Sequence, residues 1–137
     1  MRIDAGALHH IGVAVPSLDD AIRFYRDVLG YAVGREHAVP DQRVRVVFAT
    51  RETSRIELLE PTDRDSGIAR FVAERERATM HHLCFEVRDL AAALADLERA
   101  GVELIDHAPR KGVEGRVAFL HPRAAGGVLV ELIEIAR

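Results

Sequence analysis

The sequence lacks the features that mark secreted, disulfide-bonded or membrane proteins. Its single cysteine, Cys84, excludes an intramolecular disulfide and suits a reducing compartment, so we expect a cytoplasmic protein. The longest apolar runs are far short of a membrane span, and the N-terminus has no long apolar segment of the signal-peptide kind. We therefore expect no membrane partner.

An excess of positive charge is also missing. The chain has 19 Lys and Arg against 22 Asp and Glu, a net charge of −3, so nothing neutralises phosphates wholesale and no nucleic-acid partner is expected. With 137 residues, 48% of them hydrophobic, the chain fits one compact domain or two small modules that share a core. Basic residues beside a pocket can still hold an anionic small molecule.

A His…Glu pair occurs twice at nearly the same spacing. His10 and Glu57 are 47 residues apart, and His82 and Glu131 are 49 apart. Each of these His residues is the second of a His-His pair that opens an apolar strand pattern, and each Glu lies inside an apolar run. Two His and two carboxylates are the ligands of a hexacoordinate divalent metal site with open positions.

Both halves of the chain predict the same order of elements: a strand, a capped helix closed by glycine, and three further strands. The first half predicts, in order, a strand over 8–15, a helix over 18–29, and strands over 31–38, 44–50 and 55–60. Ser17 is the expected N-cap of this helix, and its expected apolar face consists of Ala21, Ile22, Phe24, Tyr25, Val28 and Leu29. The second half predicts, in order, a strand over 81–87, a helix over 90–100, and strands over 102–107, 115–120 and 128–135. Asp89 is the expected N-cap of this helix, and the residues expected to face inward are Leu90, Ala93, Leu94 and Leu97. The modules, about 8–60 and 80–135, are separated by a linker over 61–79 with a short helix around 66–76.

The register of this repeat is nearly constant. His10 precedes His82 by 72 residues, Gly30 precedes Gly101 by 71, and Glu57 precedes Glu131 by 74. An offset held through a whole unit is evidence of duplication.

Strand alternation selects the second His of each pair. His10 shares a strand face with Gly12 and Ala14, which leaves room for a cavity, whereas the bulky face should pack under the helix. His82 likewise shares a face with Cys84, which we expect to be a buried packing residue. The alternative is a strand-end His-His pair satisfied by the backbone, but two pairs in matching register favour metal ligation.

The two glutamates are better ligands than their neighbours. Glu57 and Glu131 lie inside apolar runs, where an uncompensated carboxylate is costly and a metal would remove that cost. Glu60 and Glu134, three residues further on, lie on the opposite face and fit exposed strand charges. Cobalt, manganese, zinc and nickel all suit two nitrogen and two oxygen ligands.

Several motifs resemble those of the vicinal oxygen chelate (glyoxalase, bleomycin resistance and dioxygenase) superfamily and, within it, the methylmalonyl-CoA epimerase family. The motifs are HIGVAV at 10–15, FYRDVLG at 24–30, VVFAT at 46–50, IELLEPTDRDSGIARF at 56–71, MHHLCFEV at 80–87 and AFLHPRAAGGVLVEL at 118–132. The resemblance implies an α+β fold, a single domain over residues 1–137 in which two tandem βαβββ modules form a curved mixed sheet around a metal site. It places the metal, Co²⁺ first, on His10, Glu57, His82 and Glu131, the four residues reached above.

The resemblance also implies a reaction, the epimerisation of methylmalonyl-CoA by 1,1-proton transfer through a metal-stabilised enolate. Glu131 is implied as one base. Some relatives carry a second Glu at the position of Val46, which cannot take a proton. A hairpin turn near residue 52 would place position 46 roughly across from Glu57, so we hypothesise that Glu57 is both a ligand and the second base.

The expected acyl-CoA substrate needs anion contacts. Arg110 and Lys111 are candidates, with a solvated surface turn as the alternative, and His121 is assigned a structural or substrate-adjacent role. Here the chain departs from the family, because Val113 and Glu114 replace small or neutral residues in a loop one residue shorter. The resemblance therefore supports the metal chemistry more firmly than the substrate.

Three other functions stay open at this stage. A glyoxalase-type lyase shares the two-His, two-acid site, a ring-cleaving dioxygenase uses two His and one carboxylate, and a bleomycin-resistance type protein binds small molecules without metal. The resemblance also implies a homodimer.

Overall fold

The computed structural model describes residues 1–135, which form two compact units. One unit consists of residues 10–81, and the other of residues 1–9 with the segment from His82 onward. Each unit contains a mixed sheet with a helix packed on one face. No helix in the described part of the chain is both long and apolar enough to cross a membrane.

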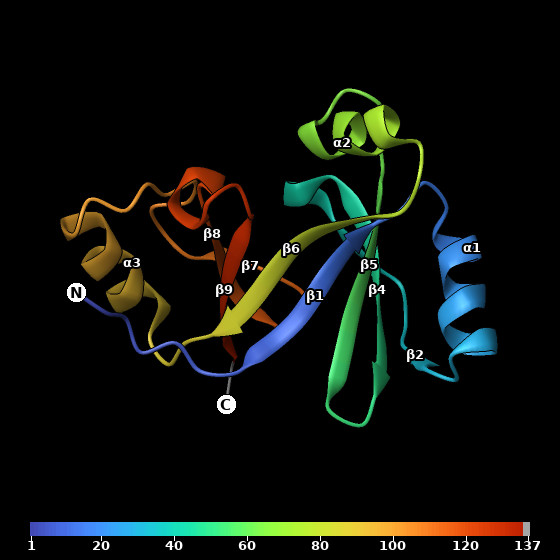
Figure 1. The fold of residues 1–137 in the computed structure, drawn as a ribbon, viewed down its shortest axis with the longest axis horizontal. Coiled ribbons are helices and arrows are strands. Elements are labelled where there is room, and N and C mark those ends of the chain that lie inside the picture. The colour runs from blue at the N-terminus through green and yellow to red at the C-terminus, as the bar shows by residue number, and fades with distance from the viewer. Residues whose placement is uncertain (136–137) are drawn as a thin grey trace. The chain divides into compact units, whose positions relative to one another are not determined.

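The unit of residues 10–81 is built on four strands that pair in the order β2-β4-β5-β1, with β3 also on β4 (Figure 1). The elements are β1 (Leu8–Ala14), α1 (Leu18–Arg23), a π-helical turn η1 (Phe24–Val28), β2 (Ala32–Val33), β3 (His37–Val39), a 3₁₀ turn η2 (Pro40–Gln42), β4 (Val44–Arg51), β5 (Ser54–Pro61) and α2 (Gly67–Arg75). β1 is parallel to β5, and β4 is antiparallel to β5.

The start of α1 is fixed by two side chains. Ser17, the predicted N-cap, accepts a hydrogen bond from the Asp20 backbone N–H at 3.2 Å. The Glu60 carboxylate accepts from the Leu18 backbone N–H at 2.9 Å and also pairs with the Arg45 guanidinium. Glu60 was expected as an exposed strand charge, but it is a half-buried helix cap that joins α1 to β5.

The predicted helix over 18–29 is α-helical only as far as Arg23. One π-helical turn follows, in which the Leu29 N–H donates to the Phe24 carbonyl at 3.2 Å. This turn is wider than an α-helical one, so the 3.6-residue periodicity fails beyond it. Phe24, Val28 and Leu29 were expected on the buried face and are exposed. The α1 side of the core is filled by Ala21, Ile22 and Tyr25, with Val13, Val15, Leu18, Val47 and Leu58.

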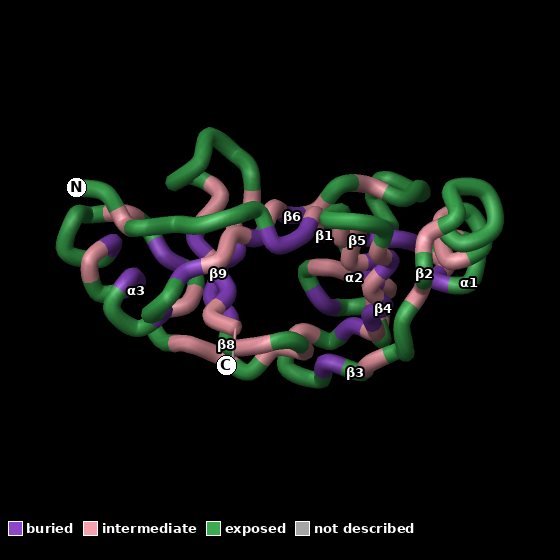
Figure 2. The backbone as a smooth tube through the Cα atoms, turned by 90° about the horizontal axis from the view of Figure 1, so that it is seen from below, coloured by how far each residue is buried: buried purple, intermediate pink, exposed green. Residues whose placement is uncertain are grey.

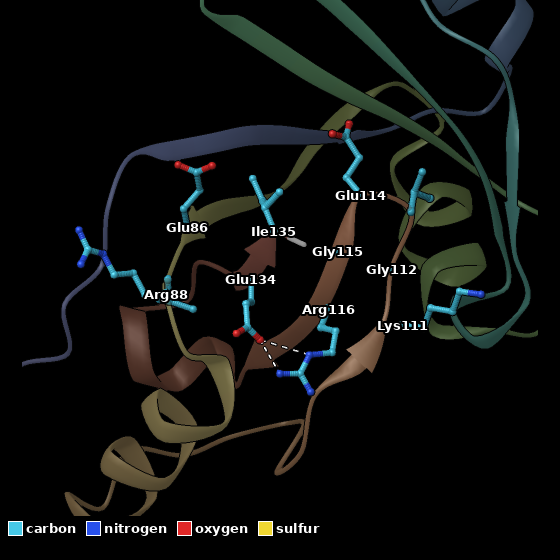
Figure 3. A pocket seen from close by; sticks show the side chains of 11 residues that line it. Glu86, Arg88, Lys111, Gly112, Glu114, Gly115, Arg116, Glu134 and Ile135 are labelled. Carbon is cyan, nitrogen blue, oxygen red and sulfur yellow. Dashed lines mark hydrogen bonds and ion pairs between the residues drawn. The ribbon is translucent and has the colours of Figure 1, made fainter. Parts of the chain in front are cut away.

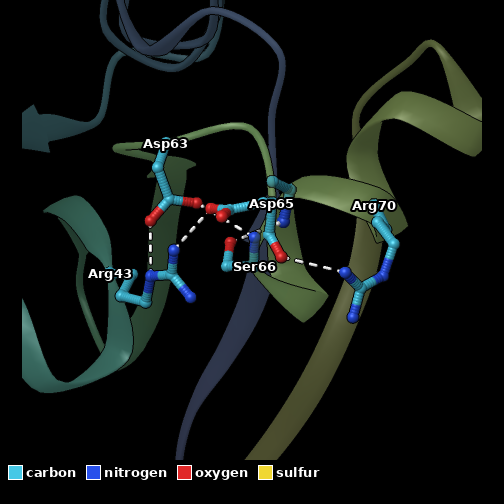
Figure 4. Close-up of polar contacts among 6 residues, drawn as sticks. Arg43, Asp63, Asp65, Ser66 and Arg70 are labelled. Atoms are coloured by element: carbon cyan, nitrogen blue, oxygen red, sulfur yellow. Dashed lines mark hydrogen bonds and ion pairs between the residues drawn. The ribbon is translucent and has the colours of Figure 1, made fainter.

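Charged hydrogen bonds fix the segment between β5 and α2 (Figure 4). Asp63 accepts from Arg43 Nε at 2.5 Å and from the Ser66 N–H at 3.0 Å, and Arg43 Nη2 donates to Asp65 at 2.6 Å. Partial desolvation raises the pKa of Asp63, but the hydrogen bonds from Ser66 and Arg43 outweigh it and hold that pKa below its usual range. Ser66 then caps α2, so the helix predicted around 66–76 is confirmed.

The other unit has strands in the order β6-β9-β8-β7. Its elements are β6 (Thr79–Glu86), α3 (Leu90–Arg99), β7 (Arg110–Lys111), β8 (Gly115–Leu120), a 3₁₀ turn η3 (Pro122–Ala125) and β9 (Val130–Ile135). β6 is parallel to β9, and β8 is antiparallel to β9. Asp89 caps α3 as predicted, by accepting from the Ala92 N–H at 3.0 Å.

The core of this unit lies between α3 and one face of β8 and β9, and Figure 2 shows the buried centre of β9. The four helix residues predicted to face inward are all buried: Leu90, Ala93, Leu94 and Leu97. Each buried leucine stabilises the fold by roughly 1.5–3 kcal/mol. The opposite face of these strands is left for the residues of the candidate site.

The strand predicted over 102–107 is wrong. Only a single bridge forms there, between Leu104 and Leu120. The Asp106 carboxylate accepts from the Phe119 backbone N–H at 2.9 Å, a bond that a strand carbonyl would otherwise make. The short β7 pairs with β8 further on, Arg110 opposite Val117.

Candidate metal centre and active site

The first His–Glu pair lies on the parallel strands β1 and β5. Gly12 is the register partner of Glu57, and His10 lies two residues earlier on the same face of β1. His10 Nε2 is 3.9 Å from Glu57 Oε1. The His10 side chain is 3% exposed and that of Glu57 14%, so both are largely shielded from water.

The second pair repeats this arrangement on β6 and β9. Cys84 is the register partner of Glu131, and His82 lies two residues earlier on β6. His82 Nε2 is 3.3 Å from Glu131 Oε1, and the two side chains are 3% and 6% exposed. The same atoms of the same residue types therefore face each other in both units, while Cys84 is fully buried as expected.

The chemistry of each pair fits half of a metal site. Ligand atoms about 2.0–2.2 Å from one ion, at right angles to each other, lie roughly 3 Å apart. The 3.3 Å of the second pair is close to this value, whereas the 3.9 Å of the first pair is longer, and each pair offers one imidazole nitrogen and one carboxylate oxygen. A divalent cation would also compensate the charge of each shielded carboxylate.

A phenylalanine lies beside each His–Glu pair, and neither phenylalanine was predicted from the sequence. Phe48 on β4 is the cross-strand partner of Glu57, and Phe119 on β8 is the partner of Glu131. The Phe48 ring meets His10 edge to face, with centroids 5.5 Å apart and planes at 77°. The Phe119 ring meets His82 in the same way, at 5.7 Å and 88°. The signal was present, since positions 48 and 119 are 71 residues apart, the offset of the two helix-closing glycines.

The register expected for Val46 is wrong by two residues. Val46 lies opposite Leu59, not opposite Glu57. The hairpin turn is centred between residues 52 and 53, one residue later than that pairing needs. Val46 is still on the Glu57 face of the sheet, as a diagonal neighbour, and it is buried.

Of the two basic residues expected to contact CoA, one lines a cavity. A cavity of about 850 Å³ lies at the ends of β6 and β9 and along the 111–116 segment, and Lys111, the only lysine of the chain, lines it (Figure 3). Arg110 is not among the lining residues, and its Nη1 donates to Asp106 at 3.2 Å. The cavity charges are of both signs, and Figure 3 shows Arg116 bonded to Glu134 while Lys111 and Arg88 point away from each other.

The loop that departs from the family pattern is a tight turn. The Gly112 N–H donates to the Gly115 carbonyl at 2.8 Å. A Cβ at residue 115 would lie 2.3 Å from the Glu134 carbonyl oxygen, so glycine is required there. Glu114 reaches toward the buried His9, with Oε2 3.9 Å from Nε2. The unusual charge at position 114 is therefore engaged with the start of β1.

His121 takes part in a local turn. Its Nδ1 accepts from the Arg123 N–H at 3.1 Å and caps η3, and its Nε2 is 3.6 Å from Glu103. Arg123 also bonds the Glu103 carboxylate, and this hydrogen bond lowers the pKa of Glu103. His121 is not among the residues that line the cavity. These contacts are local, and a role of His121 beside the substrate stays a prediction.

The chain is similar to several known proteins. The family model described as "Glyoxalase/Bleomycin resistance protein/Dioxygenase superfamily" matches residues 9–119. The human mitochondrial methylmalonyl-CoA epimerase is 41% identical over 93% of this chain and 73% of its own length. The ethylmalonyl-CoA/methylmalonyl-CoA epimerase of Cereibacter sphaeroides is 40% identical over 95% of this chain and 98% of its own length.

A solved structure extends the comparison to the fold. A variant of the Streptomyces coelicolor methylmalonyl-CoA epimerase, in complex with 2-nitronate-propionyl-CoA, superimposes with a TM-score of 0.90 at 34% identity, covering 97% of this chain and 96% of that one. The expected fold class, an α+β fold of two tandem βαβββ modules with a mixed sheet, is confirmed. The chain belongs to the glyoxalase, bleomycin resistance and dioxygenase superfamily and, within it, to the family of the methylmalonyl-CoA epimerases, which are isomerases.

Proposed function

We propose that this protein interconverts the 2R and 2S epimers of methylmalonyl-CoA. The observation that carries the proposal is the duplicated pair of shielded His and Glu side chains, His10 with Glu57 and His82 with Glu131, in a chain about 40% identical to named epimerases. Inverting C2 requires one base to remove a proton and a second group to return one on the other face. A duplicated unit supplies two equivalent carboxylates for these two roles.

We further propose that the two pairs together hold one divalent ion. Co²⁺ is the first candidate, and Mn²⁺, Zn²⁺ and Ni²⁺ suit the same donors. When bound, the ion supplies a Lewis acid that stabilises the negative charge developing as C2 loses its proton. Support comes from the donor atoms of each pair, which are separated by 3.9 Å and 3.3 Å.

The remaining steps belong to the side chains. Glu131 on β9 holds the proton on one face of the substrate, and Glu57 on β5 holds it on the other. The imidazoles of His10 and His82 would hold the ion as neutral rings, because only the neutral ring can be a ligand. Exposures of 14% for Glu57 and 6% for Glu131 keep bulk water from competing for the proton.

The test is exchange of the C2 proton of methylmalonyl-CoA in D₂O, followed by NMR, with cobalt-loaded and metal-free protein. We expect metal-dependent exchange together with interconversion of the two epimers. Ethylmalonyl-CoA serves as a second substrate, since one relative carries both names. Fully metallated protein that exchanges neither substrate contradicts the proposed reaction and directs attention to the 111–116 loop.

Lys111 is the proposed anion contact for the CoA part of the substrate. It is exposed at the rim of the cavity, and an exposed charge contributes roughly 0.2–1 kcal/mol. Lys111→Ala is therefore expected to raise KM by about two- to five-fold with kcat unchanged, because uniform binding is lost. Lys111→Arg keeps the charge and should keep KM. An unchanged KM in Lys111→Ala removes this residue from the substrate site.

Arg110 and His121 enter the proposal only as residues near the substrate, since their observed contacts are with Asp106 and with Arg123 and Glu103. The homodimer, the cytoplasmic location and the single domain over residues 1–137 stay predictions.

A further inference from the structure

We propose that Phe48 and Phe119 are positioning residues, which hold the imidazoles of His10 and His82 so that each Nε2 faces the carboxylate of its own unit. The inference rests on the proposed metal centre and deepens it, because it explains how two ligands keep one orientation. It concerns residues outside the ligand set.

Each phenylalanine ring is in direct contact with a histidine ring. In each unit the phenyl and imidazole rings meet edge to face, at 5.5 Å and 77° for Phe48 with His10 and at 5.7 Å and 88° for Phe119 with His82. Edge-to-face contacts are favoured by the ring quadrupoles and contribute roughly 0.5–1.5 kcal/mol. The χ2 torsion of a histidine has a broad, two-fold profile, so a neighbouring ring has to select one orientation.

The strand register also places each phenylalanine beside the glutamate of its unit. Each phenylalanine is the direct cross-strand partner of the glutamate, Phe48 of Glu57 and Phe119 of Glu131. Directly opposed side chains have Cβ atoms about 4.5–5.5 Å apart. One phenyl ring therefore borders both members of its pair, and it limits the movement of the imidazole relative to the carboxylate.

A phenylalanine occurs at this position in both units, although the other surroundings of the glutamate differ. On the other side of each glutamate the two units differ, since Gly12 is the partner of Glu57 and Cys84 the partner of Glu131. The volume beside the glutamate therefore differs between the units, yet both place the same aromatic residue across from it. Filling space alone does not require a ring at both positions, whereas orienting an imidazole does.

Two valines provide matched controls. Val46 lies two residues before Phe48 on the same face of β4, and Val117 lies two residues before Phe119 on the same face of β8. Both valines are buried, with 2% and 3% exposure. Truncating them removes core volume next to the site without removing a ring.

The experiment compares Phe48→Leu and Phe119→Leu with Val46→Ala and Val117→Ala. Co²⁺ is titrated into metal-free protein and followed by its visible absorption, and the imidazole signals of the metal-free protein are followed by long-range ¹H–¹⁵N NMR. We expect Co²⁺ affinity to fall about ten-fold or more in each Leu variant, the usual effect of losing a group that orients a ligand. The Leu variants should also shift the imidazole signals and the visible band, and Phe→Tyr at either position should restore both.

Thermal melting of every variant shows whether it is folded, so a loss of affinity can be read separately from unfolding. Folded Leu variants that bind Co²⁺ with wild-type affinity and spectrum overturn the inference alone. Valine variants that weaken Co²⁺ binding as much as the Leu variants also overturn it, because packing would then explain the effect. Wild-type protein that binds no Co²⁺ rejects the metal centre itself, and the inference with it.

Discussion

His82→Ala is expected to remove the metal and with it the exchange of the C2 proton. The variant loses one of two imidazole ligands and leaves the Glu131 carboxylate shielded without its cation. Loss of a group that merely orients a ligand costs about 10- to 100-fold in metal affinity, so loss of the ligand should cost more than about 100-fold. His10→Ala should behave alike, because its pair has the same atoms in the same arrangement. Metal content after dialysis and C2 exchange in D₂O measure both effects.

The sharpest control is the neighbouring histidine. His81 precedes His82 on the opposite face of β6, where its ring meets Phe71 at 5.1 Å. His81→Ala should therefore keep stoichiometric metal. His107 is a second control, since it is exposed and its Nδ1 lies 2.9 Å from Glu98 Oε1. A His82→Ala protein that retains its metal, or a His81→Ala protein that loses it, would contradict the assignment of the second histidine in each pair.

Short-range sequence rules predict much of the fold. The caps Ser17 and Asp89 and the apolar face of α3 follow from short-range rules, and all are observed. The predictions of secondary structure are wrong at two places, and at each of them a single hydrogen bond changes the regular backbone pattern. At Leu29 a bond to the carbonyl five residues earlier widens the helix, and at Asp106 a side chain replaces a strand partner. Periodicity in a sequence does not report such exchanges.

The same distinction applies to the candidate site. Alternation along the strands predicts that His10 and His82 lie on the roomier strand faces, and the structure has each of them near a glutamate. The roles of Arg110 and His121 depended on partners from loops, Asp106 and Glu103, whose positions no pattern in the sequence fixes. The two phenylalanines lay within reach of the repeat argument, because they follow the same offset as the helix-closing glycines.

Glu57→Gln and Glu131→Gln are expected to separate the two halves of the reaction. Each variant keeps an oxygen ligand but loses one proton acceptor, so interconversion of the epimers should fall about 10²- to 10⁴-fold in both. In each variant the remaining carboxylate still removes a proton from the epimer it faces and returns a deuteron to the same face. Glu57→Gln should therefore exchange C2 of one epimer and Glu131→Gln that of the other. NMR of each epimer in D₂O, with cobalt-loaded protein, measures exchange and interconversion side by side.

Glu60→Gln provides the matched control, since Glu60 is a β5 carboxylate three residues from Glu57 on the opposite face, where it accepts from the Leu18 N–H and from Arg45, and a glutamine oxygen can still accept there. It should change neither exchange nor interconversion. Glu57→Gln protein with full metal and undiminished interconversion would remove Glu57 as the second base. That result would also show that a carboxylate is not needed on the β4–β5 side of the site, where Val46 cannot supply one. Loss of exchange for both epimers in both metallated variants would instead mean that the two glutamates act together on a single face.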